Sequence, residues 1–183
     1  MQAAGRGQET LVKILIERAD VNLNQLDNYG RNALSIAAFG GHEGAVKLLL
    51  QREDIKPNTA NTEGATPLFV AAQEGHDRVV KVLLERNDVD PNTANEYHET
   101  PLLVATQKGH ERVVRILLQR LDINTDMIDL HGRSALSQAL DCEHYAIADL
   151  LSKHRNHFLR LDGNKPTTAS PPRQAGPDLG HPK

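Results

Sequence analysis

The fold is decided by the stretch Thr66-Pro67-Leu68-Phe69-Val70-Ala71-Ala72-Gln73-Glu74-Gly75-His76, because similar stretches recur along the chain every 34 residues. The repeated columns include leucine at positions 34, 68, 102 and 136, alanine at 37, 71, 105 and 139, and histidine at 42, 76, 110 and 144. This fixed-period self-similarity predicts a solenoid, in which stacked units bury a continuous core that no unit can form alone. A solenoid favours a function that depends on a binding surface.

Each unit is expected to contain two short helices. Thr66 can cap the first, because its hydroxyl can accept a hydrogen bond from a free N–H of the first turn, and Pro67 suits the first helical position. Gly75 ends this helix, and a second helix begins just after His76. The apolar positions of the second helix are Val79, Val80, Leu83 and Leu84. Turn-rich residues then link each unit to the next.

The segment 66–76, together with residues 79–84 and the turn 28–31, closely resembles the ankyrin repeat. The resemblance covers residues 1 to about 154. It implies an all-α ankyrin-repeat solenoid of stacked helix pairs with β-hairpin-like links. The period is one residue longer than the usual ~33, and this 34-residue variant is similar to the ankyrin arrays of large fungal signalling proteins.

The domain organisation follows from the repeat and from the composition of the C-terminus. We expect an ankyrin repeat domain over residues 1–154, opening in mid-repeat and continuing with repeats near 25–58, 59–92, 93–126 and 127–154. A short C-terminal extension, 155–162, leads to a tail, 163–183, that is rich in proline and poor in apolar residues and is therefore expected to be disordered. In the last repeat, Glu143 replaces the helix-ending glycine, which predicts backbone strain if the left-handed conformation is kept.

Composition sets the remaining expectations. The formal net charge is −3, and no apolar run approaches the ~20 residues needed to span a membrane. The start lacks the pattern of a secretory signal peptide, and a single cysteine, Cys142, allows no internal disulfide framework. Together these features favour an intracellular protein, cytoplasmic or nuclear.

Catalytic and metal chemistry have little support in the sequence. The column histidines lie one repeat apart, so they cannot share an ion, and we expect them to hydrogen-bond within the loop between the helices of their own repeat. His154 and His157 lack cysteine or carboxylate partners at ligand spacing. Cys142 has His144 nearby but no third group that would orient a nucleophile. We therefore expect no enzyme activity, no cofactor, no metal and no small-molecule substrate.

Charged columns are expected to be structural. Glu9, Glu43, Asp77 and Glu111 each precede a base by four residues, which is a favourable order on a solvated helix face. Arg18, Arg52, Arg86 and Arg120 close the same helices and should complement the negative end of the helix dipole.

The resemblance also implies a binding site. In ankyrin proteins, partners bind along the groove between the hairpin tips and the exposed side of the first helices. By position, the tip residues here are Tyr29, Arg31, Glu63, Glu96, Tyr97, Glu99, His131 and Arg133. The helix residues are Ile36, Phe39, Val70, Gln73, Glu74, Val104, Gln107 and Lys108. The centre of this groove is acidic and basic residues flank it, so a partner should present a basic centre, with apolar groups meeting Phe39, Val70 and Val104.

Function is expected to be non-catalytic binding of a protein partner in this groove. Alternatives are a regulatory repeat segment of a larger multidomain signalling protein and a nucleic-acid binder. The acidic groove disfavours nucleic acid, because phosphate binding requires clustered lysine and arginine.

Overall fold

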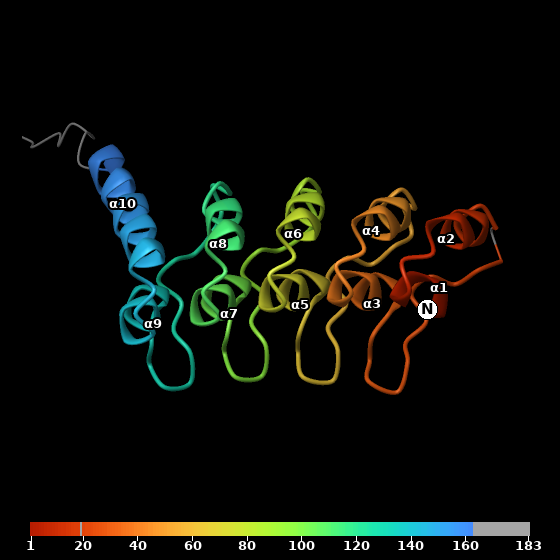
Figure 1. The fold of residues 1–183 in the computed structure, drawn as a ribbon, viewed down its shortest axis with the longest axis horizontal. Helices are drawn as coiled ribbons and strands as arrows, with labels where there is room; N and C mark the ends of the chain where they lie inside the picture. The colour runs from red at the N-terminus through yellow and green to blue at the C-terminus, as the bar shows by residue number, and fades with distance from the viewer. Residues whose placement is uncertain (19, 163–183) are drawn as a thin grey trace, which may run out of the picture.

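The computed structural model describes residues 1–18 and 20–162, and the side chains of residues 1–18 and 20–155. This part of the chain is an all-α solenoid, as predicted (Figure 1). The helices are α1 (Gln2–Gly5), α2 (Glu9–Ile16), α3 (Ala33–Phe39), α4 (Glu43–Leu50), α5 (Pro67–Gln73), α6 (Asp77–Leu84), α7 (Pro101–Gln107), α8 (Glu111–Leu117), α9 (Ala135–Asp141) and α10 (Tyr145–Asp162). The tail expected to be disordered, 163–183, lies outside the described residues.

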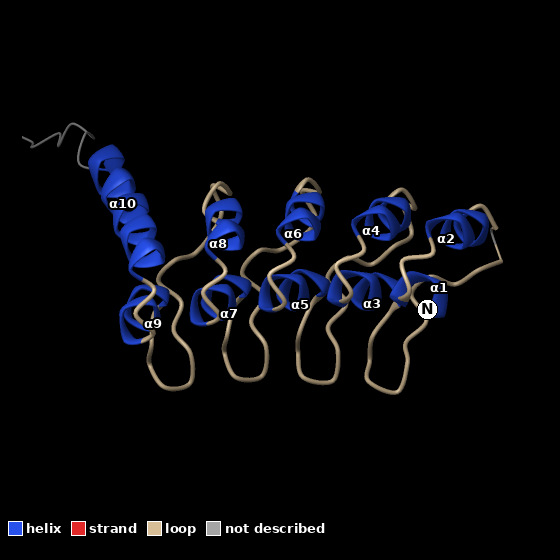
Figure 2. Cartoon of the chain, in the orientation of Figure 1, coloured by secondary structure: helices blue, strands red, loops and turns tan. Residues whose placement is uncertain are grey.

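The helices form two rows with hairpin-like loops on one side (Figures 1 and 2). In the first row α1, α3, α5, α7 and α9 pack side by side, and in the second row α2, α4, α6, α8 and the start of α10 do the same. The loops before the first helices project beyond the first row, away from the second, as tips. From α3 to α9, each first helix and the tip before it thus border one long face.

The first helices begin where the sequence predicts. Thr66 Oγ1 accepts a hydrogen bond from the backbone N–H of Phe69 at 3.2 Å, and Pro67 occupies the first turn. The equivalent caps are Asn32 to Ser35 at 2.8 Å, Thr100 to Leu103 at 3.2 Å and Ser134 to Ser137 at 3.3 Å. These bonds satisfy one free donor at each helix start and fix the direction in which the tip enters the helix.

Alanine columns set the close spacing of the first row. Ala37, Ala71, Ala105 and Ala139 are fully buried, where first helices meet their neighbours. The leucines at 34, 68 and 102 are buried beside them, whereas Leu136 in the last repeat is only partly buried. Small and large side chains therefore alternate in one core that runs the length of the array.

Asparagines clamp each loop to the next repeat. Asn58 donates from Nδ2 to the carbonyl of Asp88 at 2.6 Å and accepts at Oδ1 from the N–H of Asp90 at 3.1 Å. Asn24 and Asn92 make the same pair of bonds to the loops at 54–56 and 122–124. Each side-chain amide thus donates one hydrogen bond to the backbone of the next loop and accepts one from it, as a neighbouring β-strand does. This asparagine column was not predicted from the sequence.

The arginine column, which lies at the ends of the second helices as expected, also makes hydrogen bonds to the preceding repeat that were not foreseen. Arg86 Nη1 donates to the carbonyl of Leu50, the last residue of α4, at 3.0 Å, and its Nη2 pairs with Asp88 at 2.7 Å. The equivalent bonds are Arg52 to Ile16 at 2.9 Å and Arg120 to Leu84 at 3.0 Å. Each guanidinium therefore caps the helix of the preceding repeat, whose terminal carbonyls have no intrahelical donor.

The histidine column also reaches across the interface, so the expected bond within its own loop was wrong. The imidazole Nε2 atoms of His42, His76, His110 and His144 lie 2.9 to 3.3 Å from the carbonyl oxygens of Gly5, Phe39, Gln73 and Gln107. Because a carbonyl only accepts, each ring donates from Nε2. The helix-ending glycines make room for these rings, since a Cβ at Gly75 would lie 2.7 Å from the ring of His110.

The last repeat differs from the others in the residue that ends its first helix and in the length of its second helix. Glu143 keeps the left-handed conformation, with φ of 58°. Ala148 is buried, and its helix α10 packs against α8 and α9. The backbone of α10 continues unbroken through residues 155–162.

We expect stability to follow the buried columns. Leu83→Ala should lower the free energy of unfolding by ~2–5 kcal/mol, because Leu83 is fully buried and truncation leaves a cavity. Lys81→Ala on the exposed face of the same helix should cost less than ~0.5 kcal/mol. Urea unfolding of both variants measures this, and equal losses would mean that the inner and outer faces of α6 are assigned wrongly.

We also expect Glu143→Gly to stabilise the chain by roughly 0.5–1 kcal/mol. The left-handed conformation costs a side chain with a Cβ ~1–2 kcal/mol, and the greater unfolded-state entropy of glycine offsets about half of that. Thermal unfolding checks the sign, with Glu143→Ala as the control that retains the Cβ. A glycine variant no more stable than the alanine variant would contradict the strain.

Candidate functional site

Side-chain oxygens fix the hairpin tips. Asp27 Oδ1 accepts from the N–H groups of Tyr29 and Arg31, both at 2.9 Å. Asn61, Asn95 and Asp129 make the same two bonds two and four residues ahead, at 2.8 to 3.0 Å. These bonds set the backbone path through the tip residues at 29, 63, 97 and 131.

Neighbouring tips are joined by backbone hydrogen bonds. The N–H of Thr62 donates to the carbonyl of Tyr29 at 3.0 Å, and Glu96 donates to Glu63 at 3.0 Å. Leu130 donates to Tyr97 at 3.3 Å. The tips therefore form a connected wall that runs along the array beside the first row of helices (Figure 2). The predicted groove lies between this wall and the first helices, where residues of both line a recess.

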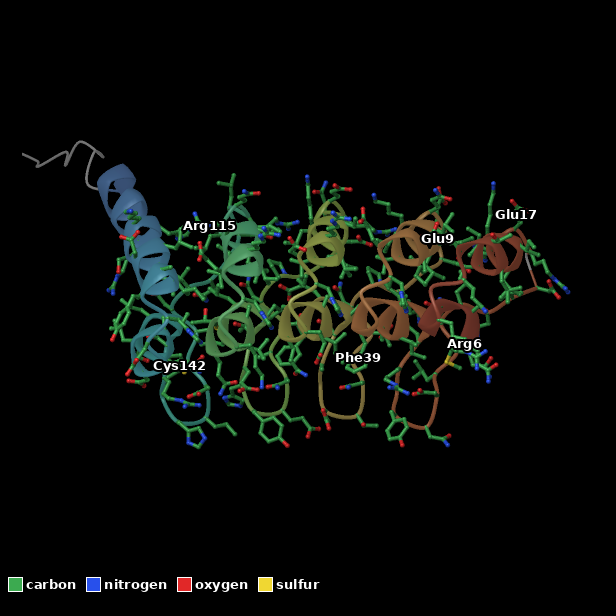
Figure 3. All side chains as sticks on the ribbon, in the orientation of Figure 1. Arg6, Glu9, Glu17, Phe39, Arg115 and Cys142 are labelled. Carbon is green, nitrogen blue, oxygen red and sulfur yellow. The ribbon has the colours of Figure 1, made fainter. Side chains whose placement is uncertain are left out.

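One recess in this groove gathers several of the predicted contact residues. Its volume is about 210 Å³, and it lies where the tips at 27–31 and 61–65 face α3 and α5. The predicted residues that line it are Tyr29, Arg31, Phe39, Glu63, Val70 and Gln73, with Ser35, Asn61, Thr62 and Ala65 beside them. Figure 3 shows Phe39 below the first helices, toward the tips, and Arg115 on the opposite, second-helix side.

Exposure separates the predicted residues into accessible and inaccessible ones. Tyr29 is 64% exposed, Tyr97 58% and Phe39 51%, so these aromatic side chains are accessible to a partner. Ile36 and Val70 are half-buried. Val104 is only 3% exposed, so it offers a partner very little surface, although Val70 at the equivalent position of α5 is half-buried. The contact of Val104 with a partner stays a prediction.

The arginines expected to flank the groove as free positive charges are paired. Arg31 Nη2 lies 2.8 Å from Asp27 Oδ2, and its guanidinium carbon lies 4.9 Å from the centre of the Tyr29 ring. The hydrogen bond from Arg31 holds the pKa of the Asp27 carboxyl below its usual range. Arg133 pairs with Asp129 at 2.7 Å in the last tip. Both tips are therefore locally neutral.

The centre of the groove carries the unpaired negative charge. Glu63, Glu74 and Glu96 are exposed, and the half-buried Glu99 accepts a hydrogen bond from Asn95 Nδ2 at 2.9 Å. The positive group on this side is the exposed Lys108. The remaining predicted residues are Gln107, half-buried, and His131, exposed. Acidic groups outnumber this lysine, so the groove favours a cationic partner.

The second-helix side of the array offers paired charges instead. Glu43 pairs with Lys47 at 2.6 Å and lies 3.9 Å from Arg78 of the next repeat. Glu111 pairs with Arg115 at 2.6 Å. These pairs fit the predicted solvated face, where an exposed ion pair contributes about 0–1 kcal/mol.

Residues 1–18 and 20–162 hold no group of three or more histidine, cysteine or acidic side chains placed to bind a metal. Within the same residues, no helix is both long and apolar enough to cross a membrane. Cys142 is exposed, and His144 is bonded to the carbonyl of Gln107 at 3.3 Å. The side chain of His157 lies outside the described residues.

A buried carboxylate supports the last tip, and the sequence reading did not single it out. Asp129 is 4% exposed. Burial favours its neutral form and would raise its pKa, but hydrogen bonds from the Arg133 N–H and guanidinium, the His131 N–H and the Gln138 amide outweigh burial and lower the pKa to about 2. The signal that was available is the pairing of Asp27 with Arg31 and Asp129 with Arg133, each four residues apart.

The lowered pKa predicts acid sensitivity. Because the carboxyl of Asp129 titrates near 2 when folded and near ~3.9 when unfolded, its contribution is complete above about pH 5 and is lost as the pH falls toward 2. We expect wild type to lose about 2 kcal/mol more than Asp129→Asn between pH 6 and pH 2. Urea unfolding across this range measures the difference, and parallel losses would contradict the shift.

Comparison with known proteins agrees with this geometry. A family model described as "Ankyrin repeats (3 copies)" matches residues 1–95 and 87–162, which together include every helix of the described residues. A search of the curated proteins found no match. The repeated helix pairs, the projecting tips and the family model together place the chain in the ankyrin repeat family.

Proposed function

We propose that the chain binds a protein partner, without catalysis, in the groove between its hairpin tips and its first helices. Ankyrin repeats are generally protein–protein interaction modules. The observation that carries the proposal is the recess at Tyr29 and Phe39, because it leaves two large aromatic side chains mostly exposed. Exposed aromatic side chains contribute little to the packing of one repeat on the next. At protein–protein interfaces, aromatic residues are enriched among those that contribute most of the binding energy.

Charge supports the same face. The groove carries Glu63, Glu74 and Glu96, which are exposed, whereas the second-helix side is covered by ion pairs such as Glu111 with Arg115. A partner with a basic centre is therefore attracted to the groove and gains little from the opposite side. The same acidic groups disfavour nucleic acid, whose phosphates need clustered positive charge.

Removal of an aromatic anchor should act on dissociation. We expect Tyr97→Ala to weaken binding by ~2 kcal/mol, mainly through a faster off-rate, if the ring is buried against the partner. The partner is first recovered by pull-down with the intact chain. Surface plasmon resonance then measures its rate of dissociation from wild type and from the variant. The control is Arg115→Ala on the second-helix face. A loss confined to the control would place the site on that face.

Reversal of the groove charge should act on association. We expect Glu63→Lys combined with Glu96→Lys to lower the on-rate at low salt, with a smaller effect at high salt, because screening shortens the range of the attraction. Stopped-flow association at two ionic strengths measures both rates. Tight, salt-sensitive binding of wild type to generic duplex DNA would instead support the nucleic-acid alternative.

A further inference from the structure

Among the described residues, the groove brings an aromatic side chain of a tip together with an aromatic side chain of a first helix at one recess. The recess at the tips 27–31 and 61–65 combines Tyr29 with Phe39 across the half-buried Val70. At the positions equivalent to Phe39, the later repeats carry Gln73, Gln107 and Asp141. Since Val104 is buried, the next stretch of groove offers Tyr97 but no second aromatic wall on the helix side.

We propose that this recess is an anchor subsite, which takes one bulky apolar side chain from an extended segment of the protein partner, while a lysine or arginine of the same segment lies against Glu63. The inference rests on the proposed function and adds to it the chemistry and the register of the bound segment.

Hydrogen bonding within the recess selects an apolar occupant. The Asn61 Oδ1 atom already accepts from Glu63 and Ala65, and the Thr62 N–H already donates to Tyr29. The Ser35 hydroxyl donates to Asn32 Oδ1 at 3.0 Å, and Arg31 is held by Asp27. A polar side chain placed against the rings of Tyr29 and Phe39 would lose its water without gaining a partner among these groups, whereas an apolar one covers the aromatic carbon surface at no such cost. The exposed carboxylate of Glu63 remains available to a basic residue beside it.

The size of the recess selects a side chain over a small molecule. Pockets for drug-sized ligands and cofactors enclose about 300–1,000 Å³. The recess measures about 210 Å³ and opens along the groove. It therefore fits one side chain of a segment whose backbone continues past the rim.

Charge sets the register of that segment. Glu63 lines the recess, and Glu96 follows it on the next tip through the bond from its N–H to the Glu63 carbonyl. On the other side of the recess, Arg31 is neutralised by Asp27 and stacked on Tyr29. A basic residue next to the anchor should therefore point toward the C-terminal end of the array.

The test uses the intact chain as bait for a display library of random 12-residue peptides. We expect enriched peptides to share a leucine, isoleucine, phenylalanine or tryptophan with a lysine or arginine a few positions away. A synthetic, fluorescently labelled copy of the most enriched peptide then gives affinities by anisotropy. Phe39→Ser should weaken its binding about 10-fold or more, and Tyr29→Ser should do the same from the opposite wall.

Leu140→Ser is the matched control. Leu140 lies near the end of α9 and is 51% exposed, the same fraction as Phe39 in α3, so both changes remove a half-exposed apolar side chain. Leu140→Ser should leave affinity unchanged. Replacing the apolar residue of the peptide by alanine should weaken its affinity for wild type about 10-fold. The same replacement should hardly change the affinity for the Phe39→Ser variant, because the apolar residue of the peptide and the Phe39 ring contact each other.

The outcomes separate this inference from the proposed function. If Glu63→Gln or Tyr97→Ala weakens the peptide but the Phe39 and Tyr29 variants do not, the groove binds and the anchor subsite is wrong. If the groove variants have no effect while Lys81→Ala or Arg115→Ala abolishes binding, the proposed function is wrong as well. A library that yields acidic peptides, or no enriched peptide, overturns the anchor subsite. Circular dichroism and thermal midpoints confirm that each variant is folded.

Discussion

The first and second helices from α3 to α9 are only seven or eight residues long, so most of their backbone groups lie in terminal turns without an intrahelical partner. A residue of the same repeat caps the start of each of these first helices, and neighbouring repeats supply donors at the helix ends. Arg86 caps the end of α4, His76 donates to the carbonyl of Phe39, and Asn58 pairs with the following loop. Burial of the alanine and leucine columns holds the repeats together, but these bonds decide how they are aligned.

The helix caps and the left-handed turn, which follow from local rules, were predictable from the sequence, as was the stacking of the repeats, whereas the side-chain bonds that join two repeats were not. Thr66 as a cap and Glu143 in the left-handed conformation follow from local rules, and both are as predicted. The bonds of the histidine column were assigned to their own repeat, and those of the arginine column were not foreseen, because the sequence does not show which neighbour a side chain reaches. The burial of Val104 was not foreseen either, because the sequence column does not show that it differs from the half-buried Val70.

The candidate site was predictable in outline. The exposure of Tyr29, Phe39 and Tyr97 agrees with their assignment to the groove, whereas their contact with a partner stays a prediction. The recess itself depends on side-chain directions across two repeats, and the neutralisation of Arg31 depends on the ion pair within its tip. The groups that stack the repeats are thus largely distinct from those that line the groove, so one set can vary while the other is kept.

The bonds between repeats join residues 30 to 37 positions apart. The asparagine and arginine bonds recur at the first three interfaces, and the histidine bond recurs at all four. Loss or duplication of one whole unit would bring equivalent donors and acceptors together again, with Arg120 meeting Leu50 as Arg86 does now. A single residue added to a link would instead displace the clamp residues on one side of it. We therefore expect the gene for this array to tolerate changes of length in steps of a whole repeat, which alters the number of sites along the groove and leaves the interface between repeats unchanged.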